Sequence, residues 1–419
     1  MNVLVKKVKI IDEKSAFHDM IMDIHIVDGI IKSIEDTIDV SDAKIIHENN
    51  LHISPGWVDL KVSTGDPGFE HKETIESTLD IASKGGFTHI CSLPSNIPVT
   101  DCKAQVQYQL KKSENHIVQL HPIGTITKAM QGLELSEMFD LHQSGCSLFS
   151  DDNGILDTGI MYRALLYAKN FNGKIILNLN ENNLSSGIAN EGIASLKTGL
   201  KSNSRVGEII QLEKIIRLVD YVDYHVHVTG ISCTESIELI KNAKTKGKKI
   251  TCDVNLMNLL FNEEDLLDFN TMMKVIPVLR SKNDQKDLIK AVQDGIIDFI
   301  VSDHRPVDQD DKESEMDHAT FGCYQLQTLF SSLLTKTNLP LNNIIHILSV
   351  KNRSMIQENI EPIAVGMKAD FTLFNPNDEI KYDENIIKGN GKWNPFYSQT
   401  LQGKVLGIIK NDLVNMIQN

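Results

Sequence analysis

The sequence predicts an α/β protein: a (β/α)₈ TIM-type barrel with a small β-sandwich domain built from both chain ends. Eight apolar runs recur between polar stops, amphipathic segments separate them, and short alternating segments occupy both ends. The 419 residues, 41% hydrophobic and 23% charged, suffice for a large buried core beside a smaller domain. We expect the β domain to comprise residues 1–53 and 362–419, and the barrel residues 54–361.

Both chain ends are predicted to form short strands, because apolar and polar residues alternate in them. Asp28-Gly29 supplies hairpin turn chemistry between two of these segments. Strand-rich segments at opposite ends of a chain commonly form one small sheet domain, which we expect here. The predicted strands are Val3–Ile11, Ile21–Val27, Ile30–Ile34, Asp370–Phe374 and Gly403–Ile409.

The middle of the chain carries eight near-continuous apolar runs. Such runs are typical of parallel strands that are buried on both faces. In a barrel, functional side chains lie where these strands end. The runs are Trp57–Val62, Phe87–Leu93, Val118–Ile126, Cys146–Phe149, Lys174–Leu179, Asp223–Val228, Lys249–Val254 and Ile296–Val301.

Helices are predicted between these runs, and alternation of eight strands with helices favours a barrel. Ser232-Cys-Thr-Glu235 has the form of a capping box at the start of one helix. A doubly wound open sheet is the alternative, but no glycine-rich dinucleotide fingerprint follows any run. The predicted helices are Glu73–Ser83, Met161–Lys169, Val206–Val219, Ser236–Lys244 and Asn283–Gln293.

Composition excludes several classes of partner. A net charge of −14 argues against nucleic acid, since phosphate binding requires a basic face. No window approaches the roughly 20 apolar residues of a membrane span, and the first residues lack the apolar run of a signal peptide. Six scattered cysteines without a CxxC pair favour reduced thiols. We therefore expect a cytoplasmic protein with no nucleic-acid or membrane partner.

Several phrases at the strand ends resemble the zinc-dependent dihydroorotases of the amidohydrolase superfamily, of the long bacterial type. They occur in family order over nearly the whole chain. The resemblance implies a (β/α)₈ barrel with a small β domain and reversible hydrolysis of a cyclic amide in pyrimidine synthesis. The phrases are PGWVDLKVSTGDPGFE (55–70), KGGFT (84–88), LPSNIP (93–98), FSDDNG (149–154), KVIPVLR (274–280), SDHRP (302–306), VGMKAD (365–370) and WNPF (393–396).

The resemblance implies two zinc ions bridged by hydroxide, yet most of the residues that would hold them are replaced. By resemblance, the six ligand positions fall on Lys61, Ser63, Asp151, Asn178, Gly230 and Asp303. Asp152 is the register alternative to Asp151, and a slip of three residues would bring His227 to the position of Gly230. An ammonium offers only donors, and serine is a poor zinc ligand. We predict no cofactor, with one weakly held metal at Asp151 and Asp303 as the alternative.

The substrate side is equally altered. By resemblance, the substrate-binding positions fall on Gly65, Ser95, Ile276 and Val307, with Asn96 as the register alternative to Ser95. Gly65 and Val307 offer an anionic substrate no charge-assisted donor. Asp303 corresponds to the aspartate that moves the proton, so we treat it as a vestigial proton shuttle.

Lys61 has a physical role in the absence of two dications. Asp151 and Asp303, if about 5 Å apart at an effective dielectric of about 20, would repel each other by roughly 3 kcal/mol. We expect the Lys61 ammonium to lie between them and stand in for the metal charge. The alternative is that Lys61 extends towards solvent.

The predicted function is a catalytically inactive dihydroorotase homologue. The resemblance implies a homodimer and a structural partnership with aspartate transcarbamoylase, the preceding enzyme of the pathway. The first alternative is an active cyclic-amide hydrolase with a one-metal site built from Asp151, Asp303 and either His227 or His304, although alternation turns His304 away from the barrel centre. The second is a ligand-binding sensor.

Overall fold

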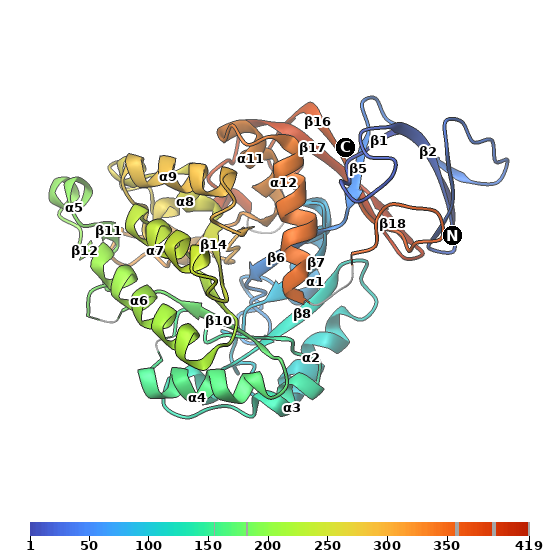
Figure 1. Ribbon diagram of the computed structural model, residues 1–419. Coiled ribbons are helices and arrows are strands. Elements are labelled where there is room, and N and C mark those ends of the chain that lie inside the picture. The colour runs from blue at the N-terminus through green and yellow to red at the C-terminus, as the bar shows by residue number, and fades with distance from the viewer. Residues whose placement is uncertain (155, 182, 357–359, 388–390, 418–419) are drawn as a thin grey trace.

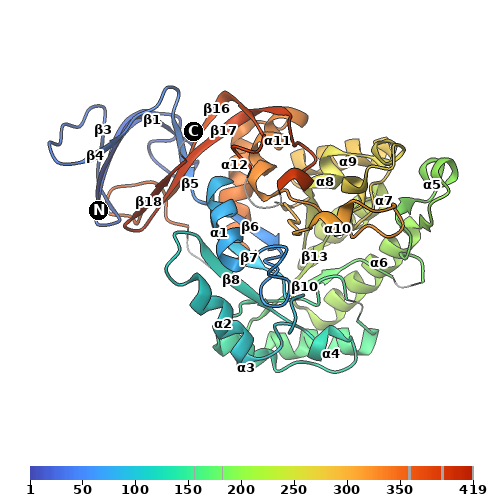
Figure 2. The ribbon, with the colours of Figure 1, turned by 180° about the vertical axis from the view of Figure 1, so that it is seen from behind.

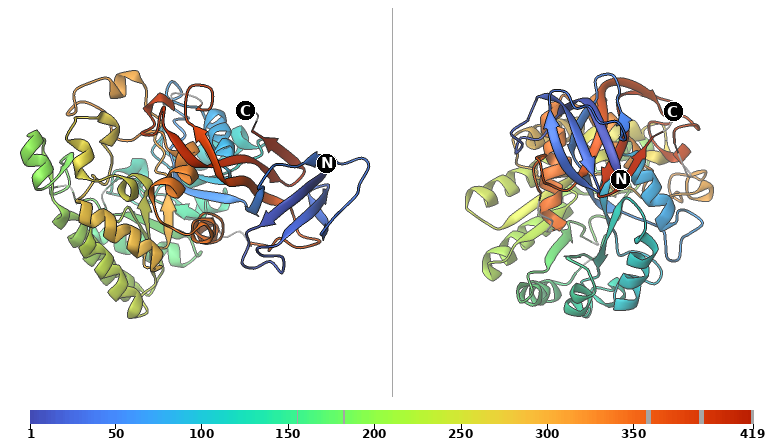
Figure 3. Two further views of the ribbon diagram at one scale, coloured as in Figure 1. Left: turned by 90° about the horizontal axis from the view of Figure 1, so that it is seen from above. Right: turned by 90° about the vertical axis from the view of Figure 1, so that its right-hand side faces the viewer.

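The computed structural model describes residues 1–154, 156–181, 183–356, 360–387 and 391–417. Two eight-stranded sheets organise the chain, one from its middle and one from its two ends (Figure 1). Helices cover the outside of the first sheet, and the second stands to one side (Figure 3). This arrangement confirms the predicted fold class.

The central sheet is parallel, and each of the eight predicted runs overlaps one of its strands. The strands follow each other in sequence order around the sheet. Their inward side chains, including Leu60, Ile123 and Ile176, form a buried cluster inside the barrel. The strands are β6 (Trp57–Val62), β7 (Phe87–Ser92), β8 (Gln119–Gly124), β9 (Leu148–Phe149), β10 (Lys174–Asn178), β13 (Val226–Thr229), β14 (Ile250–Asn255) and β15 (Phe299–Val301).

Side chains complete the seam where β6 meets β15. A single parallel bridge pairs Val62 with His304 just beyond the strands. The Asp59 carboxylate on β6 accepts a hydrogen bond of 3.0 Å from the backbone N–H of Ser302. The Asn352 amide donates to one backbone carbonyl on each strand, at 2.7 and 3.2 Å. Burial of this seam requires such partners, because unpaired backbone groups are costly away from water.

Several of the helices that follow the strands begin at a polar residue whose side chain accepts from one of their first N–H groups. Thr74 caps α1 and Ser281 caps α9. The predicted capping box at Ser232 is wrong: Cys233 is the N-cap residue of α7, and the Ser232 hydroxyl donates to the buried carboxylate of Glu208 instead. The helices are α1 (Ile75–Lys84), α2 (Lys103–Ser113), α3 (Met138–Gln143), α4 (Thr158–Lys169), α5 (Ile193–Thr198), α6 (Arg205–Val222), α7 (Thr234–Thr245), α8 (Leu256–Leu260), α9 (Lys282–Gln293), α10 (Gln309–Lys312), α11 (Leu329–Lys336) and α12 (Leu341–Ile345).

The second sheet joins the two chain ends, which lie side by side (Figure 2). Antiparallel pairing of β16 with β5 makes the link, with Phe371 opposite Pro55 and Leu373 opposite Ile53. The sheet has its own buried apolar cluster, separate from that of the barrel and its helices. Its strands are β1 (Asn2–Ile10), β2 (Ile21–Val27), β3 (Ile30–Glu35), β4 (Lys44–Ile46), β5 (His52–Pro55), β16 (Asp370–Lys381), β17 (Thr400–Lys410) and β18 (Leu413–Met416).

Two sequence expectations concern the chain as a whole. All six cysteines are free thiols. Over the ranges given above, no helix combines the length and the apolar character that a membrane crossing requires.

Candidate functional site

The centre of the barrel mouth holds two carboxylates that share one guanidinium. Asp152 follows β9 and Asp303 follows β15, and both side chains are buried. The Arg305 Nη1 and Nη2 atoms donate to the two oxygens of Asp152 at 2.9 and 2.7 Å, and Nε donates to Asp303 at 3.0 Å. Both aspartates have a positive φ, 46° and 50°. This strained backbone costs of order 1–3 kcal/mol per residue and typically occurs at functional sites.

Lys61 lies beside the same cluster, at the end of β6. Its ammonium is 3.4 Å from an oxygen of Asp303 and donates to the side-chain oxygen of Asn255 at 3.3 Å. The Asn255 amide in turn donates to the second oxygen of Asp303 at 2.9 Å. Asp303 therefore has three polar neighbours: it accepts hydrogen bonds from Arg305 and Asn255 and forms an ion pair with Lys61.

Asp151 does not take part, so the expected placement of Lys61 between Asp151 and Asp303 is wrong. The Asp151 carboxylate turns away and accepts from the backbone N–H groups of Ile126 and Thr127, at 2.7 and 3.0 Å. The left-handed backbone at Asp152 instead directs that residue, the register alternative, to the mouth. Burial raises the pKa of Asp151 and outweighs its hydrogen bonds. Burial also acts to raise the pKa of Asp152, but Arg305 outweighs it and lowers the value to about 2.

Sequence reasoning missed Arg305. It occupies the fourth place of the SDHRP phrase and was given no role. The available signal was spacing: residues two apart in an extended segment point to the same side, so Asp303 and Arg305 share a face. Burial opposes the charge, but the two carboxylates still raise the pKa of the Arg305 guanidinium, which is therefore a permanent cation.

The remaining predicted metal positions do not supply ligands at the mouth. The Ser63 N–H donates to the His304 carbonyl, and the Asn178 amide donates to the backbone carbonyl of Asp152. Gly230 contributes only its N–H, which donates to Asp253. Within the described part of the chain, no group of three His, Cys, Asp or Glu side chains could hold a metal ion. Zinc requires such a set, so these residues do not fit the family's metal pair.

The histidines proposed as alternative ligands have other partners. The two ring nitrogens of His227 lie 2.9 Å from Asp253 and 3.1 Å from the Thr251 hydroxyl. Burial lowers the pKa of His225, which also contacts Thr251, to about 4. The His304 ring lies 2.9 Å from Glu73, outside the barrel centre as alternation predicts.

The predicted substrate positions fall into two groups. The Ser95 hydroxyl joins the mouth cluster by donating to Asp152 at 2.8 Å, whereas its alternative Asn96 holds the Asp66 carbonyl. Gly65 has a φ of +67°, and a Cβ there would lie 2.5 Å from the Glu73 carbonyl, so no arginine fits on this backbone. Ile276 offers only its carbonyl to the Asn255 amide, and Val307 is completely buried.

Little space remains at the mouth. The cavity beside Lys61, Asn178 and Gly230 has a volume of about 20 Å³. A second one, between Lys61 and His227, has a volume of about 10 Å³. A volume of roughly 10–15 Å³ holds one water molecule, whereas ligand pockets run from about 300 Å³. Neither cavity accommodates a cyclic amide in this conformation.

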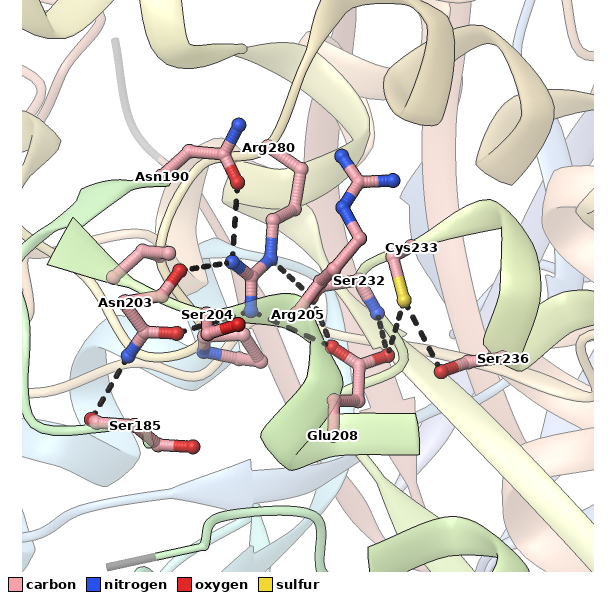
Figure 4. A network of polar contacts seen from close by, with 12 residues as sticks. Ser185, Asn190, Asn203, Ser204, Arg205, Glu208, Ser232, Cys233, Ser236 and Arg280 are labelled. Atoms are coloured by element: carbon pink, nitrogen blue, oxygen red, sulfur yellow. Dashed lines mark hydrogen bonds and ion pairs between the residues drawn. The ribbon is translucent and has the colours of Figure 1, made fainter. Parts of the chain in front are cut away.

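Arg280, a buried arginine, supports the rim of the mouth (Figure 4). It donates to the carbonyl of Asn203 at 2.8 Å, to the side chain of Asn190 at 3.1 Å and to the Ser232 hydroxyl at 3.1 Å. The Glu208 carboxylate accepts from Ser232 and lies 3.9 Å from the guanidinium. Arg280 therefore anchors the segment that carries α5.

Comparison with known proteins gives consistent results. A family profile described as "Dihydro-orotase-like" matches residues 51–236. A dihydroorotase from Acetivibrio thermocellus is 34% identical over 416 residues, which cover 98% of this chain and 97% of the relative. A dihydroorotase from Aquifex aeolicus is also 34% identical, covering 98% of each chain.

Solved structures with the same fold are more distant in sequence. The L-hydantoinase (dihydropyrimidinase) from Arthrobacter aurescens superposes with a TM-score of 0.84 at 19% identity, covering 100% of this chain and 97% of that one. The dihydropyrimidinase from Brevibacillus agri gives 0.82 at 17% identity, with 99% and 95% covered. These likenesses establish the fold. The full-length identity to curated relatives establishes more: this chain belongs to the dihydroorotase family.

Proposed function

We propose that this member of the dihydroorotase family does not catalyse metal-dependent hydrolysis of a cyclic amide. One observation carries the proposal: Arg305 binds Asp152 and Asp303 together, at the position where the family's carboxylates would meet metal. The family reaction needs a hydroxide made nucleophilic by metal and a polarised carbonyl. Guanidinium and ammonium groups neutralise the carboxylates but supply no such nucleophile.

The state of Asp303 supports the proposal. A proton shuttle must reach the reacting atoms within hydrogen-bond distance. Both Asp303 oxygens already have partners in Arg305, Asn255 and Lys61. The two cavities beside its neighbour Lys61, with volumes of about 20 and 10 Å³, are too small for the substrate. We accordingly keep Asp303 as a vestigial proton shuttle.

We propose that the protein, without catalytic activity, has a structural role in pyrimidine synthesis. The chain retains the length of its relatives while the mouth is altered, which favours selection on its outer surface. By family resemblance we propose a cytoplasmic homodimer and aspartate transcarbamoylase as the partner. Copurification with that enzyme from the source cells, and a defined complex of the two purified proteins in light scattering, would support this role. Two non-interacting species would contradict it.

The inactivity is tested on the wild-type protein. Dihydroorotate and N-carbamoyl-aspartate are each supplied as substrate, after chelation and after reloading with Zn²⁺ or Mn²⁺, and bound metal is measured on the same samples. The Aquifex aeolicus relative serves as positive control. We expect no turnover above background and no stoichiometric metal. Metal-dependent turnover that Asp303→Asn abolishes would instead establish the alternative, a hydrolase with a rearranged one-metal site.

A further inference from the structure

Oxygen-bearing side chains converge on the guanidinium of Arg305 and its partners. Asp152 and Asp303 accept directly from the guanidinium. Ser95 donates its hydroxyl to Asp152 at 2.8 Å, and Asn255 donates its amide to Asp303 at 2.9 Å. Carboxylate and hydroxyl oxygens are ligands that hard cations such as Mg²⁺ and Mn²⁺ accept, whereas the side-chain oxygen of Asn255 faces Lys61. The mouth therefore has the donor chemistry of a hard-cation site around a position that a protein cation fills.

The geometry of Arg305 makes it an effective occupant of this position. Its planar fork binds Asp152 through two parallel hydrogen bonds and still reaches Asp303. The Asp152 and Asp303 side chains are 4% and 6% exposed and that of Arg305 is 16% exposed, so solvent screens their interaction weakly. A divalent ion could enter only by displacing a guanidinium that is attached to the chain.

We propose that Arg305 is a covalently attached substitute for a divalent cation: it holds Asp152 and Asp303 together and excludes Mg²⁺ and Mn²⁺ from a site that these carboxylates would otherwise form. Lys61 contributes to the exclusion, because its ammonium lies 3.4 Å from Asp303. The inference rests on the proposed function in one respect, namely that the wild-type mouth carries no divalent ion. It goes further by naming the side chain responsible and the class of cation excluded.

Two substitutions of Arg305 distinguish the effect of its charge from the effect of its volume. Arg305→Ala removes both the charge and the volume of the guanidinium, whereas Arg305→Met removes the charge but keeps most of the volume. Mn²⁺ binding is measured by calorimetry and by electron paramagnetic resonance on both variants and on the wild type. We expect the alanine variant to bind one Mn²⁺ at least about tenfold more tightly than the other two. Adding Asp152→Asn to the alanine variant should remove this gain, and adding Lys61→Met should increase it.

Two results would overturn the inference. They are a folded alanine variant that binds Mn²⁺ no more tightly than wild type, and a gain that survives Asp152→Asn. None of these measurements uses turnover, so the outcome is separate from the assay of the proposed function. Metal-dependent turnover by wild type, with Mn²⁺ still bound at least about tenfold more weakly than by the alanine variant, would remove the proposed function and leave this inference standing.

The alanine variant could fail to fold because two buried carboxylates lose their counter-charge. In that case it is refolded in parallel with Mn²⁺ and with K⁺ at matched ionic strength. Recovery of folded protein in Mn²⁺ alone supports the inference, since a hard cation then replaces the guanidinium. Equal failure in both salts contradicts it.

Discussion

Each end of the barrel places a carboxylate among cationic side chains, buried at one end and half-buried at the other, but the clusters join different parts of the chain. At the mouth, Asp303 lies between Lys61 and Arg305, and all three residues belong to the barrel or its loops. The opposite end of the barrel, where its strands begin, is called the floor here. There Asp370 of β16 accepts from Arg353 at 2.7 Å and lies 2.9 Å from a ring nitrogen of His89 on β7. The floor cluster thus connects the end sheet to the barrel.

This difference separates a cluster that holds the molecule together from one that fills a site. Arg353 at the floor also donates to the carbonyl of Gly56, which lies between β5 of the sheet formed by the chain ends and β6 of the barrel. Lys410 of β17 lies 3.9 Å from Asp370 and donates to the Thr88 carbonyl on β7. Loss of the Asp370 contacts at the floor should therefore destabilise the whole fold, whereas loss of the Arg305 contacts should mainly affect the mouth.

The largest expected effect is at the floor. Asp370→Ala removes a carboxylate that the buried cations of Arg353 and Lys410 contact, and breaking a buried pair in this way costs about 3–5 kcal/mol. We expect a loss of that size in the free energy of unfolding, measured by urea denaturation. Asp378→Asn, an exposed carboxylate on the same strand, is the matched control and should change stability by less than about 0.5 kcal/mol. Similar values for both variants would show that the floor cluster does not hold the sheets together.

Arg305→Met at the mouth should have a smaller effect, of about 2–3 kcal/mol, because Arg305 is partly exposed and its loss leaves the strands intact. A double-mutant cycle with Asp152→Asn isolates the interaction between the two side chains. The double variant should recover much of the loss, since it leaves one carboxylate fewer without a partner. An additive cycle would mean that the guanidinium contributes packing and not charge.

The same contrast explains what could be predicted from the sequence. Barrel strands were found because burial on both faces leaves continuous apolar runs such as Trp57–Val62. The proximity of Lys61 to Asp303 followed from their places at strand ends. The sequence could not predict whether Asp151 or Asp152 faces the mouth, because the two aspartates are adjacent. The positive φ of Asp152, which decides this, cannot be inferred from the residue types. The floor was not predicted, because the contact of Asp370 with His89 spans 281 residues.

The two ends should also respond to different ranges of pH. Burial lowers the pKa of His121 well below 6.5, and that of its neighbour His89 is lowered by burial as well, so the folded floor favours neutral rings. The unfolded chain then binds more protons, so stability should be lost as the pH falls below about 6.5. The mouth behaves differently: the depressed pKa of Asp152 gives stability above about 3.8 that is lost only as the pH falls towards 2.

Urea denaturation at a series of pH values tests this separation. Wild type should lose stability progressively as the pH falls below about 6.5. His121→Gln should flatten this range, while Arg305→Met, which raises the pKa of Asp152, should flatten only the range below about pH 4. An unchanged slope in the His121 variant would place the acid sensitivity elsewhere, for example at His225, whose pKa is about 4.

The smallest expected effect belongs to Asp59→Asn at the seam, because this carboxylate acts mainly as an acceptor. Burial raises the pKa of Asp59 to about 6, against its hydrogen bonds with Ser302 and Lys61, so ionisation weakens the fold. This contribution to stability is present below about pH 3.8 and is lost as the pH rises through 6. Asp59→Asn keeps an acceptor without the charge and should change stability at pH 7 by less than about 1 kcal/mol. Relative to wild type, this variant should gain stability as the pH rises from about 4 to 7.

Asp59→Leu leaves two buried N–H groups unpaired and should cost about 1–3 kcal/mol for each. Equal losses in the two variants would mean that the negative charge itself closes the barrel.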